Sequence, residues 1–154
     1  MIPVNAYAAQ SKTSSLAPFN FERRAVGPHD VQVEILFCGV CHSDLHQVRD
    51  EWGGSIYPMV PGHEIVGKVI SVGADVTKFK AGDIAGVGVM VDSCRVCKNC
   101  KQDLEQYCVE GMTGTYNAME RDKKTIAQGG YSTQIVVDEK YVLHVSEKLD
   151  LKAV

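Results

Sequence analysis

The amino-acid sequence predicts a mainly β protein with an antiparallel barrel. Its 154 residues, of which 45% are hydrophobic and 23% charged, suffice for one domain with a buried core. Short strand-like runs follow one another along the chain and are separated by turn residues, a spacing typical of antiparallel barrels. The clearest run alternates Val31, Val33, Ile35 and Phe37 with polar residues, and this period of two marks a half-buried strand.

The other elements are expected in the following order. Residues 5–10 form a first strand, and residues 11–18 form a polar loop that is broken by proline. Residues 65–72 are apolar on both faces and predict a buried strand, in which Gly67 marks a bulge or a close approach of two backbones. Further strands are expected at residues 84–91, 131–137 and 141–145.

The stretch at residues 39–46 (GVCHSDLH) is the richest in chemical groups, with a thiol, two imidazoles, a hydroxyl and a carboxylate. Thiolate and imidazole are preferred zinc ligands, and a nearby carboxylate can orient a ligating histidine. One such segment cannot close a tetrahedral site, and the best distant partner is His63, just before the strand at 65–72. Cys41 and His63 are therefore predicted to be two ligands of an open, catalytic zinc, whereas Cys38 is expected to be a packed residue.

A short helical turn is expected from about residue 45 to residue 48. Ser43 and Asp44 both suit its N-cap, and the turn would place His46 near Ser43. The loop that follows is rich in glycine and proline, as are many loops that line pockets. Its Trp52 is equally compatible with the wall of a substrate pocket and with a half-buried packing residue.

A second cluster of chemical groups is a loop with the spacing C-x2-C-x2-C-x7-C. Six cysteines in a chain without a secretory signal argue for metal binding rather than for disulfides. Four thiolates on one short loop can close a tetrahedron, which predicts structural zinc. An iron–sulfur cluster and four unrelated thiols are the less favoured alternatives. The expected ligands are Cys94, Cys97, Cys100 and Cys108.

The basic residues of this loop have two possible roles. Arg95, Lys98 and Lys101 either lower the pKa of the thiols or are plain solvated charges. For the whole chain, a formal charge of -3 and a pI of about 5.9 give no case for nucleic-acid binding. Apolar runs are far shorter than the roughly 18 residues of a membrane span, so no membrane partner is expected and the cytoplasm is the expected location.

Several of these motifs together resemble a known family. Residues 62–67 (GHEIVG), preceded by residues 41–46 (CHSDLH) and followed by the four-cysteine loop, resemble the zinc-dependent medium-chain alcohol dehydrogenases. Residues 57–64 (YPMVPGHE) and 104–108 (LEQYC) resemble their cinnamyl alcohol dehydrogenase-like branch in particular. This resemblance implies a partly open, GroES-like catalytic domain with short helices over residues 1–154. It also implies a structural-zinc lobe at about residues 92–109.

The resemblance also implies roles for the residues around the catalytic zinc. Cys41 and His63 would be ligands, with Glu64 beside the metal or as an occasional ligand, and the family's third ligand would be a cysteine beyond Val154. Asp44 would orient His63 by accepting a hydrogen bond from its free ring N–H.

Three further residues would serve the proton and the cofactor. Ser43 would hydrogen-bond the substrate oxygen, and His46 would pass the proton to solvent through the cofactor ribose. His42 would approach the cofactor pyrophosphate, although a plain surface histidine is an equal alternative.

The implied activity is that of an NADP-dependent alcohol dehydrogenase or aldehyde reductase, a homodimer when complete, that acts on small-molecule primary alcohols and aldehydes. The Rossmann cofactor domain is expected to be absent from this chain, which has no G-x-G-x-x-G motif in a strand–turn–helix context. Asp150 looks like the N-cap of a helix of which only four residues are present. The chain alone is therefore expected to fold without catalysing turnover. The alternative is a non-catalytic zinc-binding module with a structural or partner-binding role.

Overall fold

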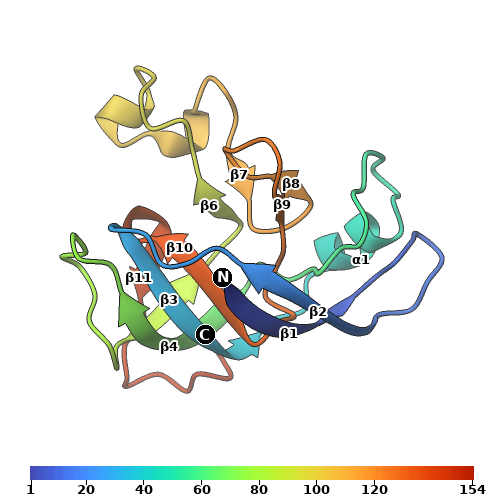
Figure 1. Cartoon of the computed structure of the whole chain (residues 1–154), viewed down its shortest axis with the longest axis horizontal. Helices are drawn as coiled ribbons and strands as arrows, with labels where there is room; N and C mark the ends of the chain where they lie inside the picture. Colours follow the sequence, from blue (N-terminus) through green and yellow to red (C-terminus); the bar gives the residue numbers. More distant parts are fainter.

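The computed structural model describes residues 1–154 and centres on a curled five-stranded sheet (Figure 1). The strand order is β10-β3-β4-β5-β11, and all neighbouring strands are antiparallel. This arrangement confirms the mainly β, antiparallel prediction. The strands are β3 (Asp30–Cys38), β4 (Ile65–Val72), β5 (Ile84–Val87), β10 (Gln134–Asp138) and β11 (Val142–His144).

The sheet curls because its two edge strands are close in sequence. Only the 3-10 helix η3 (Glu139–Tyr141) joins β10 to β11. Three residues span at most about 10 Å, so the two edges must approach each other and the sheet becomes a partly open barrel. The inward side chains form the main core, built mostly from branched aliphatic residues: Val31, Val33, Ile65, Val69, Phe79, Ala85, Val87, Ile135, Val137, Tyr141 and Val142.

A two-stranded hairpin of β1 (Ile2–Ala8) and β2 (Ala17–Arg23) lies beside this barrel. The first strand therefore begins earlier than residues 5–10, and β2 was not predicted at all. Its apolar face consists of Phe19 and Phe21, which are too few to reveal a strand by alternation. Proline disguised it further, because Pro18 is tolerated on an edge strand that needs no N–H at that position.

The expected strand at residues 84–91 is in fact two strands. After β5 the chain leaves the barrel, and β6 (Met90–Asp92) pairs with β7 (Thr113–Gly114) at the base of the four-cysteine loop, which projects from the sheet in Figure 1. The expected strand at 131–137 begins only at Gln134, and that at 141–145 is shorter because Tyr141 belongs to η3.

The prediction for Gly67 is confirmed. A Cβ atom there would lie 2.2 Å from the backbone oxygen of Glu34, so the two strands could not approach as they do. Near the last residue, Asp150 Oδ1 accepts a hydrogen bond from the Lys152 amide at 3.1 Å, and the segment that follows is a turn, in line with the expectation that four residues cannot sustain a helix.

One α-helix and several one-turn or two-residue elements complete the fold. None of the helices has the length and apolarity required to cross a bilayer. The remaining elements are α1 (His42–Val48), η1 (Cys100–Gln102), η2 (Glu105–Tyr107), β8 (Ala118–Met119) and β9 (Ile126–Ala127).

Candidate functional site

The structure brings the four cysteines of the loop together. Their sulfur atoms all lie within 4.8 Å of one another, with 3.5 Å between Cys97 and Cys100 and 3.8 Å between Cys94 and Cys100. A tetrahedral zinc with bonds of about 2.3 Å to sulfur requires sulfur–sulfur distances of about 3.8 Å. The four thiols, which include Cys108, therefore fit a single zinc ion.

Backbone amides prepare these sulfur atoms for a metal. The amide of Cys97 points at Cys94 Sγ at 3.3 Å, that of Cys100 at Cys97 Sγ at 3.5 Å, and that of Cys94 at Cys108 Sγ at 3.4 Å. Such donors favour the thiolate over the thiol. The Cys100 amide in particular lowers the pKa of Cys97 to about 6, and the Cys94 amide lowers the pKa of Cys108. The pKa of Cys94 is instead raised to about 11, because burial and the neighbouring thiols of Cys108 and Cys97 outweigh its amide donors.

The basic side chains of the loop contribute less. Arg95 forms ion pairs with Asp92 at 2.8 Å and with Asp138 at 2.5 Å, so its charge is already balanced by carboxylates. Lys98 and Lys101 are exposed. Of the two possible roles of these residues, the structure favours that of plain charges, which are either solvated or paired with carboxylates.

A second group of ligand atoms comes from two segments that are distant in sequence. Cys41 follows β3, and His63 and Glu64 precede β4; their ligand atoms lie within 4.8 Å of one another. The segments meet because β3 and β4 pair up to their ends, and the Gly39 amide continues the ladder by donating to the Glu64 carbonyl at 2.8 Å. A side chain at position 39 would occupy the place of the Glu64 carboxylate, because a Cβ there would lie 2.1 Å from Oε2.

Helix α1 begins earlier than predicted. Its first residue is His42, and Cys41 is the N-cap, so neither Ser43 nor Asp44 has that role. Asp44 instead accepts a hydrogen bond from the Cys41 amide at 3.0 Å, as the third residue of a capping box does. The early start leaves Ser43 and His46 one turn apart on the same helix, as expected.

The Asp44 carboxylate is the hub between the two segments. It is only 3% exposed and accepts hydrogen bonds from the amides of Cys41 at 3.0 Å and Gly62 at 3.1 Å, and from the hydroxyl of Tyr131 at 3.2 Å. Its Oδ1 lies 3.4 Å from His63 Nδ1. The expected hydrogen bond between them is not formed at this distance, and His63 Nδ1 has no other partner.

The His63 ring is arranged as that of a metal ligand would be. Its Nδ1 is buried without a hydrogen-bond partner, and it faces the carboxylate. A metal-bound imidazole normally places its second nitrogen against such an acceptor. Nε2 is then left for a metal, and the orphaned Nδ1 would gain a partner with a small movement. The residues present thus fit a zinc ion at this second site.

A cavity of about 390 Å³ adjoins His63 and also has Ser43 in its wall. Trp52 lines the same cavity and stacks on His46 with ring centroids 4.8 Å apart, so the substrate-wall interpretation fits better than that of a packing residue. Tyr116 lies across the cavity and stacks on His63 at 5.8 Å. Sequence reasoning missed Tyr116, because nothing in its local sequence distinguishes it from any other buried tyrosine.

The two remaining predicted residues, His46 and His42, are also part of α1. His46 Nδ1 is 2.5 Å from Glu51 Oε2, and the ring is partly exposed, which leaves it in contact with solvent. His42 is exposed, with its ring 6.3 Å from that of His46. Neither histidine lines the cavity that contains Ser43.

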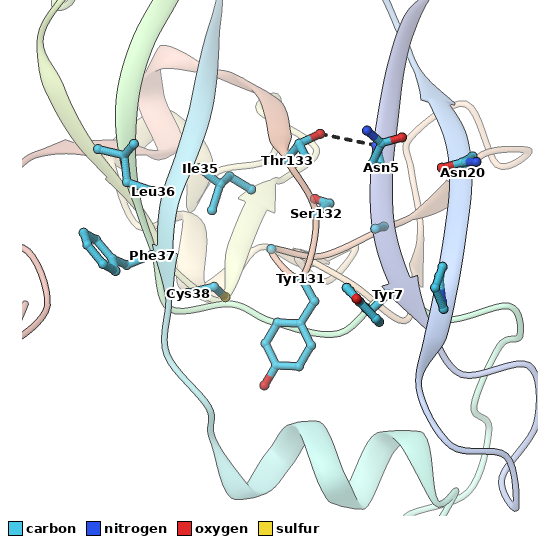
Figure 2. Close-up of a pocket in the computed structure, with 13 residues that line it drawn as sticks. Asn5, Tyr7, Asn20, Ile35, Leu36, Phe37, Cys38, Tyr131, Ser132 and Thr133 are labelled. Atoms are coloured by element: carbon cyan, nitrogen blue, oxygen red, sulfur yellow. Dashed lines mark hydrogen bonds between the residues drawn. The ribbon is translucent and has the colours of Figure 1, made fainter.

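A second hollow, of about 530 Å³, lies between the hairpin and β3 (Figure 2). It contains Tyr7, Tyr131 and Cys38 but none of the predicted ligands. Burial raises the pKa of Cys38 to about 11, so this side chain stays a thiol and packs against the core, as expected from its place on the strand.

Residues 27–147 match the family model of the alcohol dehydrogenase GroES-like domain. NADP-dependent alcohol dehydrogenase C 1 of Mycolicibacterium smegmatis is 58% identical over 154 residues, which cover 99% of this chain and 44% of that protein. Aldehyde reductase YahK of Escherichia coli is 54% identical over 142 residues, which cover 92% of this chain and 40% of that protein. The chain thus spans less than half the length of the curated relatives it matches.

Solved structures give the same result. The crystal structure of CAD from Helicobacter pylori in complex with NADP(H) matches with a TM-score of 0.93 at 45% identity, over 98% of this chain and 44% of that one. A cinnamyl alcohol dehydrogenase of Sorghum bicolor matches with a TM-score of 0.93 at 44% identity, over 97% of this chain and 42% of that one. These matches confirm the GroES-like fold and the family resemblance expected from the sequence motifs.

Proposed function

Because the chain belongs to the alcohol dehydrogenase GroES-like domain family, we propose that it is the catalytic-domain portion of a zinc-dependent, NADP(H)-linked alcohol dehydrogenase or aldehyde reductase. The reaction would interconvert primary alcohols and aldehydes. The observation that carries this proposal is an open ligand set of Cys41, His63 and Glu64, whose His63 lines the same cavity as Ser43. The non-catalytic alternative loses support, because the relatives are named as dehydrogenases and reductases.

Two zinc ions with different duties are part of the proposal. The four-cysteine lobe, at about residues 92–109, would hold a structural zinc, since four protein ligands leave no position open. Cys41 and His63 would hold the catalytic zinc, with Glu64 as an added ligand or beside it. When bound there, zinc supplies Lewis-acid chemistry, which polarises a substrate oxygen.

The protein residues would handle the proton. Ser43 lies in the cavity wall with its hydroxyl available to hydrogen-bond a substrate oxygen and to hold the proton that leaves or joins it. His46, one turn further along α1 and partly exposed, would pass that proton to solvent, with Glu51 fixing its ring through Nδ1. Tyr116 and Trp52 would form part of the wall around the reacting group.

NADP is the proposed hydride carrier. The Mycolicibacterium relative is named as NADP-dependent, and the Helicobacter structure holds NADP(H). Within this chain, exposed His42 at the start of α1 is the residue we assign to the cofactor pyrophosphate. We also propose that residues 1–154 fold alone without turning over substrate, because hydride transfer needs a cofactor-binding fold and the relatives are more than twice as long.

The resemblance also underlies two broader proposals. The whole enzyme would be a homodimer, and it would work in the cytoplasm. The second proposal is in line with six cysteines that form no disulfide, since cytosolic thiols are generally kept reduced.

The test is an assay of NADPH oxidation by the whole enzyme with a panel of aldehydes. His63→Ala should lose the catalytic zinc and nearly all turnover, whereas Ser43→Ala should keep both zinc ions and lower kcat by about 10²- to 10⁴-fold. Lys12→Ala, an exposed position far from the cavity in sequence, is the control and should behave as wild type. Undiminished turnover in His63→Ala would contradict the proposal.

A further inference from the structure

The segment of residues 128–132, called the strap below, supports the loop that carries His63. Its amides donate to that loop in succession: Gly129 to the Val60 carbonyl at 2.7 Å and Gly130 to the Gly62 carbonyl at 2.9 Å. This approach needs glycine, because a Cβ at Gly129 would lie 2.4 Å from the Pro61 carbonyl oxygen. The strap therefore lies closer to the His63 loop than a side chain at position 129 would allow.

The strap is itself held in place by a buried guanidinium. Arg23 donates from Nη2 to the carbonyls of Gln128 at 2.8 Å and Gly129 at 3.1 Å, and from Nε to the carbonyl of Gln134 at 2.7 Å. Hydrogen bonds from a charged donor are roughly twice as strong as neutral ones. The backbone at both ends of Tyr131 is thus fixed.

From this fixed backbone, Tyr131 reaches both metal-ligand segments. Its ring projects toward α1 in Figure 2. The ring covers Gly62, where a Cβ would lie 2.6 Å from Tyr131 Cδ1, and so it touches the residue before His63. Its hydroxyl donates to Asp44 Oδ2 at 3.2 Å, the same oxygen that accepts the Cys41 amide.

We propose that Tyr131 is a positioning residue for the second metal site, acting through Asp44. With Oδ2 held by Tyr131 and by the Cys41 amide, the carboxylate plane is fixed and Oδ1 faces His63 Nδ1. Without the hydroxyl, the carboxylate can rotate, and the acceptor that faces His63 Nδ1 is no longer held in place for a metal-bound imidazole. Burial, followed by the charge of Asp44, raises the pKa of Tyr131, so the hydroxyl keeps its proton and remains a donor.

This inference rests on the proposed function and is tested by metal binding rather than by turnover. The four-cysteine site of the chain is filled with zinc, and Co²⁺ is then titrated into the second site and followed by its visible absorption bands. The variants are Tyr131→Phe, which removes only the hydroxyl, and Tyr7→Phe as the matched control. Tyr7 lines the same hollow, is 57% exposed, and its hydroxyl forms no hydrogen bond in the structure.

Tyr131→Phe should weaken Co²⁺ binding about tenfold and change its absorption bands, in line with the loss of an outer partner of a metal-bound histidine. Tyr7→Phe should bind Co²⁺ as wild type does, and both variants should keep the zinc of the four-cysteine site. Wild-type affinity and spectrum in Tyr131→Phe, or loss of both metals from it, would overturn the inference and leave the proposed function intact. A wild-type chain that binds no Co²⁺ would instead overturn the proposed catalytic centre, and this inference with it.

Discussion

The four-cysteine loop and the Cys41–His63–Glu64 group differ in where their ligands come from and in what holds them. The loop takes all four ligands from one short segment, and its own backbone amides point at the sulfur atoms. The second group joins two segments across the end of β3 and β4, and its alignment depends on Asp44 and on the strap at residues 128–132. A closed site of this kind can form locally, whereas the open site needs the whole barrel.

Because of this difference, we expect the four-cysteine site to stabilise the fold and the second site to serve the reaction. Four thiolates complete the coordination of a structural zinc and leave no room for a substrate. The second group offers three candidate ligands, of which His63 lines a cavity, and the buried Asp44 carboxylate beside it is proposed to orient His63 rather than to bind the metal. Perturbing the first site should therefore affect folding, and perturbing the second should affect metal affinity with less effect on folding.

Cys97→Ser should have the largest effect. It should release the zinc of the loop and lower the free energy of unfolding by several kcal/mol, since zinc binding of about 10–16 kcal/mol in zinc fingers contributes directly to folding. Elemental analysis and thermal unfolding measure both changes. Cys38→Ser is the control, because Cys38 belongs to neither ligand group, and it should retain the metal content of wild type. Equal metal loss in the two variants would show that the loss does not depend on removing a ligand of the loop.

Asp44→Asn should act on the second site alone. The amide has one acceptor oxygen instead of two, so the donors that share the carboxylate cannot all be satisfied. We expect metal affinity there to fall about 10- to 100-fold, with the four-cysteine site unaffected. Chelator competition measures both affinities in one experiment. Asp75→Asn, at a mostly exposed carboxylate, should change neither, and an effect of similar size there would contradict the role of Asp44.

Gly129→Ala should show that the second site depends on distant packing. The new Cβ would clash with the carbonyls of Pro61 and Gly62, at 2.4 and 2.5 Å, and should cost about 1–3 kcal/mol of stability while weakening the second metal. Gly88→Ala is its control, because nothing lies within 4 Å of a Cβ there. The free energies of unfolding of the two variants, measured with denaturant, should differ clearly. Equal values would show that the strap can move to accommodate the new side chain.

Lys98→Gln combined with Lys101→Gln should have the smallest effect. Both side chains are exposed, and the lowered pKa of Cys97 comes chiefly from a backbone amide rather than from a nearby charge. Exposed charges contribute little, so zinc affinity of the loop should change by about twofold or less. A tenfold loss would show that the lysines stabilise the thiolates after all.

The two sites also differ in how far sequence alone could reveal them. The spacing C-x2-C-x2-C-x7-C identifies the closed group because all its ligands are neighbours in sequence. The open group could be assembled only by pairing Cys41 with the distant His63, and its supporting residues Tyr116 and Tyr131 were not found. Their contacts arise from tertiary structure, which no local pattern records.

The elements of the fold also differ in how well the sequence alone predicts them. The alternation in β3 and the apolar run of β4 predicted the bounds of these strands closely. Their burial is less complete than expected, because Phe37 lies beyond a register shift in β3 and is 38% exposed, and Ile70 on the outer face of β4 is 43% exposed. The hairpin partner β2 was missed, since two half-buried phenylalanines carry too weak a signal. The start of α1 was placed three residues late, because the N-cap is Cys41, a residue type that the usual preference for oxygen side chains does not suggest.

The most direct test of the account is the zinc stoichiometry of the wild-type chain under a graded chelator titration. We expect two zinc ions per chain that leave in separate steps. The weakly held zinc at Cys41 and His63 should leave first, and that of the four cysteines should leave only at much higher chelator concentration, together with loss of folded structure. Iron instead of zinc, no metal, or two zinc ions released in a single step would contradict a molecule with one closed and one open metal site.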